Sequence, residues 1–312
     1  MSASTVASLI DFEAEESPFW WERTGQPVHT VKEMVKEIIL YQDRWRNLKD
    51  SIDENIREKV DRYFLRKFLY HSNNMSNTTE AVESYLDTGI IPQKPLSKTE
   101  REPLNLRETR NYLFEEVKKV EESDEAKKLH GLLEMNLVKY AHILVLKDIE
   151  LPKGYTRPGK ISDKRRFTYF RGKIYEYASP EGLEQKVQTL LDRYNDLITH
   201  CVKEAVGDLE DQMYKMFKTC GFLLFELLDL HPFSTGNGRL CRLLCNYVLS
   251  SVTPFPAPIY NGWSESKKDD YYEALESARE STPRHPTSLT TMIIESNYHG
   301  WRKFFELLEE GR

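Results

Sequence analysis

Apolar residues recur every three or four positions over most of the chain, which is the period of helices that bury one face. Two such helices are expected in residues 31–71. Further helices are expected at about 105–120, 124–147, 181–206, 211–230, 240–250, 271–279 and 301–308. Residues 86–106 hold three prolines and one glycine and are expected to be a connector. The pattern predicts an all-α protein.

The helical period breaks between residues 154 and 182. Two aromatic-rich runs, at 167–170 and 173–177, flank the pair Arg171-Gly172. Short runs of this composition around a glycine-containing turn are typical of a β-hairpin. Because a lone hairpin adds little stability, we expect this one to serve a function.

Residues 1–27 are expected to form a surface tail, with Phe19, Trp20 and Trp21 as an anchor onto the rest of the protein. The N-terminus lacks a basic segment and a long apolar run, so no secretory signal or membrane span is expected. A cytoplasmic location is the interpretation, with a secreted effector as the alternative. The four cysteines are interpreted as reduced, buried thiols.

The 312 residues carry a net charge of −6, and the pI is near 5.9. A protein of this charge has no general attraction for nucleic acid or for an anionic membrane. Any phosphate ligand must therefore be held locally, which favours a small-molecule pocket.

Residues 231–242 read HPFSTGNGRLCR. Pro232 disfavours helical geometry at the preceding residue, so a helix should end there and expose His231 at the mouth of a loop. An imidazole has an ordinary pKa near 6.5 and can accept a proton at neutral pH. His231 is therefore a candidate general base.

The second half of this string predicts an anion site. Gly236 and Gly238 allow close backbone approach before a helix start whose N–H groups point outward. Arg239 and Arg242 lie three positions apart, share one helix face and can bind phosphate oxygens. Asn237 either hydrogen-bonds a ligand or tolerates a left-handed turn. A plain helix connector would explain any one of these residues, but not the whole ordered string.

The string resembles the signature of Fic-domain proteins, His-Pro-Phe-x-Asp/Glu-Gly-Asn-Gly-Arg-x-x-Arg, and the likeness extends over roughly residues 105–295. It implies a Fic-type helical bundle with a β-hairpin flap, and transfer of AMP from ATP to a hydroxyl of a target protein. The expected organisation is a tail at 1–27, N-terminal helices at 28–104 that pack on the core, and a Fic catalytic core with C-terminal helices at 105–312.

The resemblance also implies roles for individual residues. His231 would be the general base for the target hydroxyl. The residues expected to bind the nucleotide and its phosphates are Gly236, Asn237, Gly238, Arg239, Arg242 and Tyr272, the last beside Tyr271 in a stretch that is equally explained as helix core. The residues of the flap expected to dock the target are Phe167, Thr168, Tyr169 and Phe170.

Two positions depart from the family pattern. Thr235 stands where the family has an acidic Mg²⁺ ligand, and a neutral hydroxyl is a weaker ligand for that ion. Residues 70–80 resemble the family's inhibitory helix, in which Ser72 and Asn77 match but Ser76 replaces the glutamate that pairs with the second motif arginine. The inhibitory ion pair is therefore expected to be missing.

The resemblance implies ATP as co-substrate, Mg²⁺, and a protein partner that presents a Ser, Thr or Tyr hydroxyl. Two other functions remain open. One is transfer of UMP, phosphocholine or phosphate from another diphosphate donor, and the other is a peptide-binding module that has lost catalysis. The oligomeric state is also left open, a homodimer included.

Overall fold

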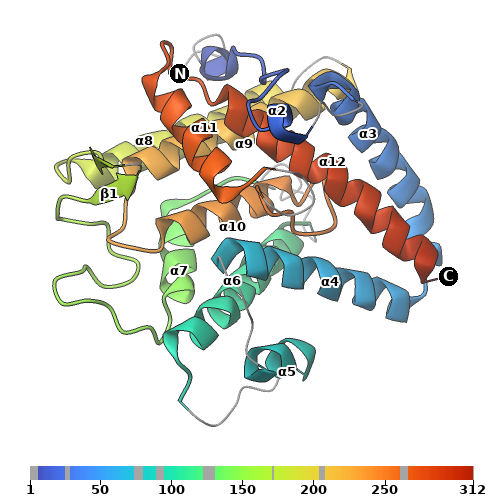
Figure 1. Ribbon diagram of the computed structural model, residues 1–312, viewed down its shortest axis with the longest axis horizontal. Coiled ribbons are helices and arrows are strands. Elements are labelled where there is room, and N and C mark those ends of the chain that lie inside the picture. Colours follow the sequence, from blue (N-terminus) through green and yellow to red (C-terminus); the bar gives the residue numbers. More distant parts are fainter. Residues whose placement is uncertain are drawn as a thin grey trace. The chain divides into compact units, whose positions relative to one another are not determined.

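A computed structural model gives the fold and describes residues 6–24, 29–73, 80–88, 95–121, 131–170, 172–203, 208–260 and 266–311 (Figure 1). The chain divides into two compact units. The first comprises Met1–His71, Asp196–Phe225 and Val248–Arg312, and the second comprises Ser72–Asn195 and Glu226–Tyr247. The domain boundaries expected at residues 27 and 104 stay predictions.

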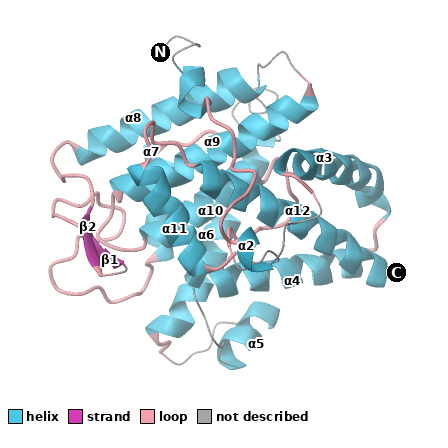
Figure 2. Cartoon of the chain, turned by 45° about the horizontal axis from the view of Figure 1, so that its top comes forward, coloured by secondary structure: helices cyan, strands magenta, loops and turns pink. Residues whose placement is uncertain are grey.

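Helices make up nearly all the regular structure of the described residues, and two strands form one hairpin (Figure 2). In chain order the helices are η1 (Ser8–Ile10), α2 (Trp21–Thr24), α3 (Val31–Leu48), η2 (Lys49–Ser51), α4 (Glu54–Asn73), α5 (Glu80–Thr88), α6 (Lys98–Glu121), α7 (Met135–Val145), α8 (Leu183–Asp196), the π-helix η4 (Leu197–Lys203), α9 (Leu209–Leu230), α10 (Asn237–Leu249), α11 (Lys268–Glu280) and α12 (Thr287–Glu310). The strands are β1 (Phe167–Phe170) and β2 (Lys173–Glu176). Within the described ranges, no helix is long and apolar enough to cross a membrane.

The first unit is built around α12, which packs against α3 and α11. Its core is aromatic, with Phe64, Phe255, Trp301 and Phe304 each less than 2% exposed and in mutual ring contact. Gly221 of α9 faces Thr290 of α12, where an added Cβ would overlap the threonine hydroxyl. A side chain at 221 would push these helices apart.

The N-terminal segment is anchored to the first unit, as its tryptophans predict. The indole N–H groups of Trp20 and Trp21 donate to the two carboxylate oxygens of Glu295 at 2.9 and 3.0 Å. Arg23 makes a bidentate ion pair with Asp270 at 2.9 and 2.5 Å. Because Glu295 is 3% exposed, its two donors satisfy a carboxylate that would otherwise be costly to bury.

The second unit contains α6 packed on α5 and α7. Asn105 of α6 donates from Nδ2 to the carbonyls of Val145 and Lys147, and so caps the end of α7. Asn195 exchanges two hydrogen bonds with the backbone of Leu133, at 2.8 and 2.9 Å. These bonds fix the two ends of the segment that carries α7.

The hairpin confirms the prediction from the aromatic runs. β1 and β2 pair antiparallel, with Phe167 opposite Glu176 and Phe170 opposite Lys173. The expected turn residue Arg171 lies outside the described residues, and Gly172 has the positive φ of 81° that favours glycine in tight turns.

Three expected boundaries differ from the structure. α6 begins at Lys98, so the second half of the expected connector is helical and Pro103 lies inside the helix. α7 is shorter than expected and begins at Met135. The last helix is longer than expected and begins at Thr287 rather than near Trp301.

Candidate functional site

The end of α9 presents His231. The helix stops at Leu230, as Pro232 predicts, and His231 has a φ of 47° in the left-handed region. Its N–H still donates to the carbonyl of Leu227 at 3.1 Å. The histidine therefore lies at the C-terminal end of a helix, where the helix dipole favours positive charge.

Asn237 closes the loop that follows. Its Oδ1 accepts from the N–H of Phe233 at 2.9 Å, and its Nδ2 donates to the carbonyl of the same residue at 2.7 Å. Gly236 has a φ of 81°, and its carbonyl accepts the first helical bond of α10, from Leu240. The N–H groups of the first turn of α10 therefore have no partner within the helix. The left-handed residue of this turn is Gly236 and not Asn237, whose side chain closes the turn, and a role of Asn237 toward a ligand stays a prediction.

His142 of α7 braces this loop from outside the motif. Its Nδ1 accepts from the N–H of Gly159 at 2.9 Å, and its Nε2 lies 2.9 Å from the carbonyl of Thr235, to which it donates. The ring stacks on Phe233 with centroids 3.7 Å apart. Burial lowers the pKa of His142 to about 4, which keeps the neutral tautomer that both bonds require.

Arg239 pairs with a carboxylate from α6. Its Nη1 lies 3.0 Å from Oε1 of Glu102, and the two side chains are only 14% and 20% exposed. Burial lowers the pKa of the Arg239 guanidinium, and Glu102 opposes that effect. Nothing in the spacing of the motif predicts this partner, because it lies 137 residues away from Arg239 in the sequence.

Arg242 contacts the end of α4. Its Nη2 donates to the carbonyl of Ser72 at 2.7 Å, and the residue is 7% exposed. The expected inhibitory segment thus contributes a backbone carbonyl to the second motif arginine. Ser76 and Asn77 lie outside the described residues, so the missing inhibitory ion pair stays a prediction.

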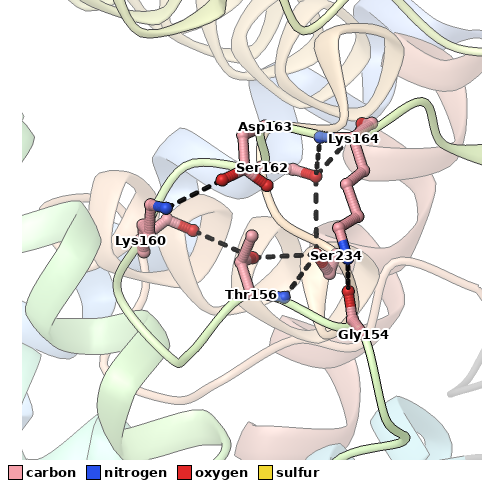
Figure 3. A network of polar contacts seen from close by, with 7 residues as sticks. All are labelled: Gly154, Thr156, Lys160, Ser162, Asp163, Lys164 and Ser234. Atoms are coloured by element: carbon pink, nitrogen blue, oxygen red, sulfur yellow. Dashed lines mark hydrogen bonds and ion pairs between the residues drawn. The ribbon is translucent and has the colours of Figure 1, made fainter.

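A polar network joins the motif to the loop before the hairpin (Figure 3). The Oγ of Ser234 accepts from the N–H of Thr156 at 3.1 Å and contacts Oγ1 of the same residue at 2.8 Å. It also contacts Oγ of Ser162 at 3.4 Å. The loop lysines make bonds of their own, Lys160 to Asp163 and Lys164 to the carbonyl of Gly154. The network holds residues 154–164 against the motif.

The base of the hairpin contacts His231. Tyr177 stacks on the imidazole with centroids 3.8 Å apart and an interplanar angle of 11°. Arg166 donates from Nε to the His231 carbonyl at 2.6 Å. Sequence reasoning missed both residues, as it missed His142 and Glu102. In the sequence, Tyr177 is one aromatic residue among several and Arg166 is one arginine in a basic run, so neither residue stands out.

The face of the hairpin that bears Phe167 is open. Phe167, Tyr169 and Ile174 lie on the same face and are 54%, 72% and 73% exposed. Thr168 lies on the other face, and the side chain of Phe170 lies outside the described part of the chain. Large apolar side chains are seldom gathered on solvent-exposed surface without a partner, so this face is a candidate docking surface.

Thr235 does not provide a carboxylate for a cation. Among the described residues, no group of three or more His, Cys, Asp or Glu side chains could hold a metal ion. Mg²⁺ is usually bound by one or two carboxylates together with substrate phosphates. The residues at the motif therefore do not fit a protein-bound Mg²⁺ site, and the weak metal role of Thr235 stays a prediction.

Tyr271 and Tyr272 lie on α11 in the first unit. Tyr271 is 2% exposed and contacts the rings of Tyr260 and Tyr272. Burial of this kind agrees with the helix-core interpretation of Tyr271. The nucleotide-binding role of Tyr272 stays a prediction. The cysteines described, Cys220, Cys241 and Cys245, are buried thiols, as expected.

Known proteins resemble this chain in sequence and in fold. Residues 125–249 match the model of the Fic/DOC family. A Fido domain-containing protein of Dictyostelium discoideum is 26% identical over 136 residues, which cover 43% of this chain and 84% of that protein.

Two solved structures have the same fold at low identity. A Fic domain-containing signaling protein from Bacteroides thetaiotaomicron superposes with a TM-score of 0.63 at 16% identity, covering 88% of this chain and 97% of that one. Fic-1 from C. elegans, residues 134–508, gives 0.62 at 16% identity, covering 88% and 71%. The fold is therefore the mostly helical Fic fold with a two-stranded hairpin, and the chain is a Fic/DOC domain protein.

Proposed function

We propose that this chain is a protein nucleotidyltransferase that transfers AMP from ATP to a Ser, Thr or Tyr hydroxyl of a target protein. The observation that carries the proposal is the arrangement of residues 231–242. One braced loop joins a histidine at the C-terminal end of α9 to the N-terminus of α10. Fic/DOC family membership makes transfer of this type the expected chemistry.

In the proposed reaction the target hydroxyl oxygen attacks the α-phosphorus of ATP. The hydroxyl proton moves to the imidazole of His231, and the bond from the α-phosphorus to the bridging oxygen of the β-phosphate breaks. Pyrophosphate leaves with the electron pair of that bond, and the target carries AMP as a phosphodiester. The α9 C-terminus stabilises the imidazolium formed in this step.

Arg239, Arg242 and the N–H groups at the start of α10 would hold the phosphates. Both arginines lie in or next to the first turn of α10 and already bind oxygen atoms of the chain, one a carboxylate and one a carbonyl. A phosphate at Arg239 therefore competes with Glu102. Since Thr235 lacks the charge that a hard cation prefers, no step of the proposal passes through a metal ion.

The hairpin would dock the target. Its exposed apolar face offers contacts for side chains, and its strands offer backbone groups to an extended segment. Phe167 and Tyr169 would contact the segment whose hydroxyl enters the site. Thr168 and Phe170 alternate with them along β1 and would take part through their backbone groups.

Thr235 favours a second candidate with the same fold. A neutral residue at this position changes how the diphosphate is bound, so another diphosphate donor would give transfer of UMP, phosphocholine or phosphate. The attack and the role of His231 would be the same. A thermal-shift screen of donors, with Mg²⁺ and with a chelator, separates the candidates because a ligand that binds the folded state raises the melting temperature.

The test is the intact mass of the full chain, and of proteins in a lysate, after incubation with ATP. We expect addition of one AMP group by the wild type and none by His231→Ala. The matched control is His200→Ala, an exposed histidine on the π-helix, which should label like the wild type. Equal labelling by His231→Ala would overturn the mechanism. Peptide binding to the hairpin without any labelling would indicate a binding module.

A further inference from the structure

Two residues outside the motif meet at the base of the hairpin and contact His231. Arg166 directly precedes β1 and Tyr177 directly follows β2. The N–H of Tyr177 donates to the carbonyl of Arg166 at 3.0 Å, which extends the hairpin ladder by one rung. The base of the hairpin therefore contacts His231, the residue that would carry the proton.

Arg166 distributes its donors over four backbone carbonyls. Nε donates to His231 at 2.6 Å, and Nη2 donates to Leu230 at 3.1 Å and to Ala178 at 2.5 Å. Nη1 donates to Lys164 at 2.8 Å. The residue is 6% exposed, and it satisfies carbonyls at the end of α9 and on both sides of the hairpin.

Tyr177 fixes the plane of the imidazole. The two rings are nearly parallel, so the contact covers one face of the histidine ring and restricts its rotation. Tyr175, on the same face of β2, donates from its hydroxyl to Asp229 at 2.6 Å. Tyr175 attaches β2 to the last turn of α9, and Tyr177, directly after β2, contacts His231, directly after α9.

His231 requires this support because of its backbone. A φ of 47° is unfavourable for a residue with a Cβ, and such conformations persist only where surrounding contacts impose them. The Arg166 bond holds the carbonyl of that peptide, and the Tyr177 stack holds the ring.

We propose that Arg166 and Tyr177 are positioning residues for His231, and that they fix the base relative to the hairpin that docks the target. The inference rests on the proposed function. It implies that the hydroxyl of an extended segment bound along the hairpin meets the imidazole in a defined register. The reason is that the rung formed by Arg166 and Tyr177 is part of the hairpin and also contacts His231. This role differs from the phosphate contacts of the motif, so loss of either residue should slow turnover and leave nucleotide affinity unchanged.

The first test needs no turnover. Ring protons of an imidazole stacked on an aromatic face experience an upfield ring-current shift, and comparison with His231→Ala assigns the His231 signals in the proton NMR spectrum. We expect the shift in the wild type and in Tyr177→Phe, and its loss in Tyr177→Leu. The matched control is Tyr169→Leu, the same substitution in the same hairpin at a ring that is 72% exposed, which should leave the His231 signals in place.

The second test separates this inference from the proposed function. With ATP and a target, Tyr177→Phe should keep the wild-type kcat. Tyr177→Leu and Arg166→Lys should lower kcat at least tenfold with KM for ATP unchanged. Lysine keeps the charge of Arg166 but cannot span four carbonyls. An unchanged kcat in Tyr177→Leu, with the ring-current shift lost, would overturn the positioning role and leave the function standing. A wild type that shows the shift but transfers no group would overturn the proposed function.

Discussion

The buried His142 makes the stability of the second unit depend on pH. Its pKa is about 4 in the folded protein against 6.5 in the unfolded chain, because burial disfavours the charged form. Well above pH 6.5 both states are neutral. As the pH falls from 6.5 towards 4 the unfolded state binds the proton first, so stability is lost across this window. The free energy of unfolding changes by about 3 kcal/mol over the whole window, of which about 2 kcal/mol is lost by pH 5.

The test compares the wild type with His142→Gln and His142→Asn, which do not titrate. Urea unfolding at pH 8 and pH 5, followed by far-UV circular dichroism, gives the free energy of unfolding of each protein. We expect the wild type to lose about 2 kcal/mol more than either variant between the two pH values. His71 and His299, whose pKa values burial also lowers to about 4, cancel in this comparison. A parallel loss in all three proteins would refute the reasoning.

Three further predictions concern the motif loop and its arginines. Glu102→Gln should tighten ATP binding about fivefold in calorimetry, because a phosphate no longer competes with a carboxylate for Arg239; weaker binding would mean that Glu102 orients the arginine. Thr235→Asp should make ATP affinity depend on Mg²⁺, since a carboxylate binds that ion better than a hydroxyl, and equal affinities with and without Mg²⁺ would contradict this. Asn237→Ala should destabilise the protein by about 2 kcal/mol in chemical unfolding, because it leaves the buried N–H and carbonyl of Phe233 without their partners. A loss below 0.5 kcal/mol, roughly the effect of an ordinary surface change, would show that the turn does not need this side chain.

The parts of the fold that depend on local chemistry could be predicted from the sequence. The hairpin could be predicted because its aromatic runs and its glycine turn lie close together in the sequence, and the structure confirms it. The end of α9 could be predicted because Pro232 acts on the residue before it, and the structure confirms this as well. The string at 231–242 identified the loop that joins α9 to α10. These signals are short in range and do not need the rest of the chain.

The long C-terminal helix could not be predicted over its full length. Its first half buries Ser288, Thr290, Glu295 and Asn297, so polar residues occupy positions where the helical period calls for apolar ones. Their partners include the N-terminal segment, through the bonds from two tryptophans to Glu295. A helix buried on several faces has no polar stripe to reveal it.

The start of α6 was missed for a different reason. Three prolines predicted a connector, but α6 runs through Pro103 in its second turn, although the proline ring removes one N–H donor there. Ser97 and Glu100 cap this start reciprocally, with the serine N–H donating to the carboxylate at 2.9 Å. The helix therefore begins before Pro103 and carries Glu102 to the motif.

The partners of Arg239 and Arg242 lie outside the region that matches the Fic/DOC family. Glu102 and Ser72 both precede residue 125, and the bond from Arg242 to Ser72 joins residues 170 positions apart. A fragment limited to residues 125–249 would contain the complete signature and yet leave two guanidinium groups without their oxygen partners. A piece of this protein that reproduces both arginine contacts must therefore include Ser72, and during synthesis these contacts can form only after Arg242 has left the ribosome.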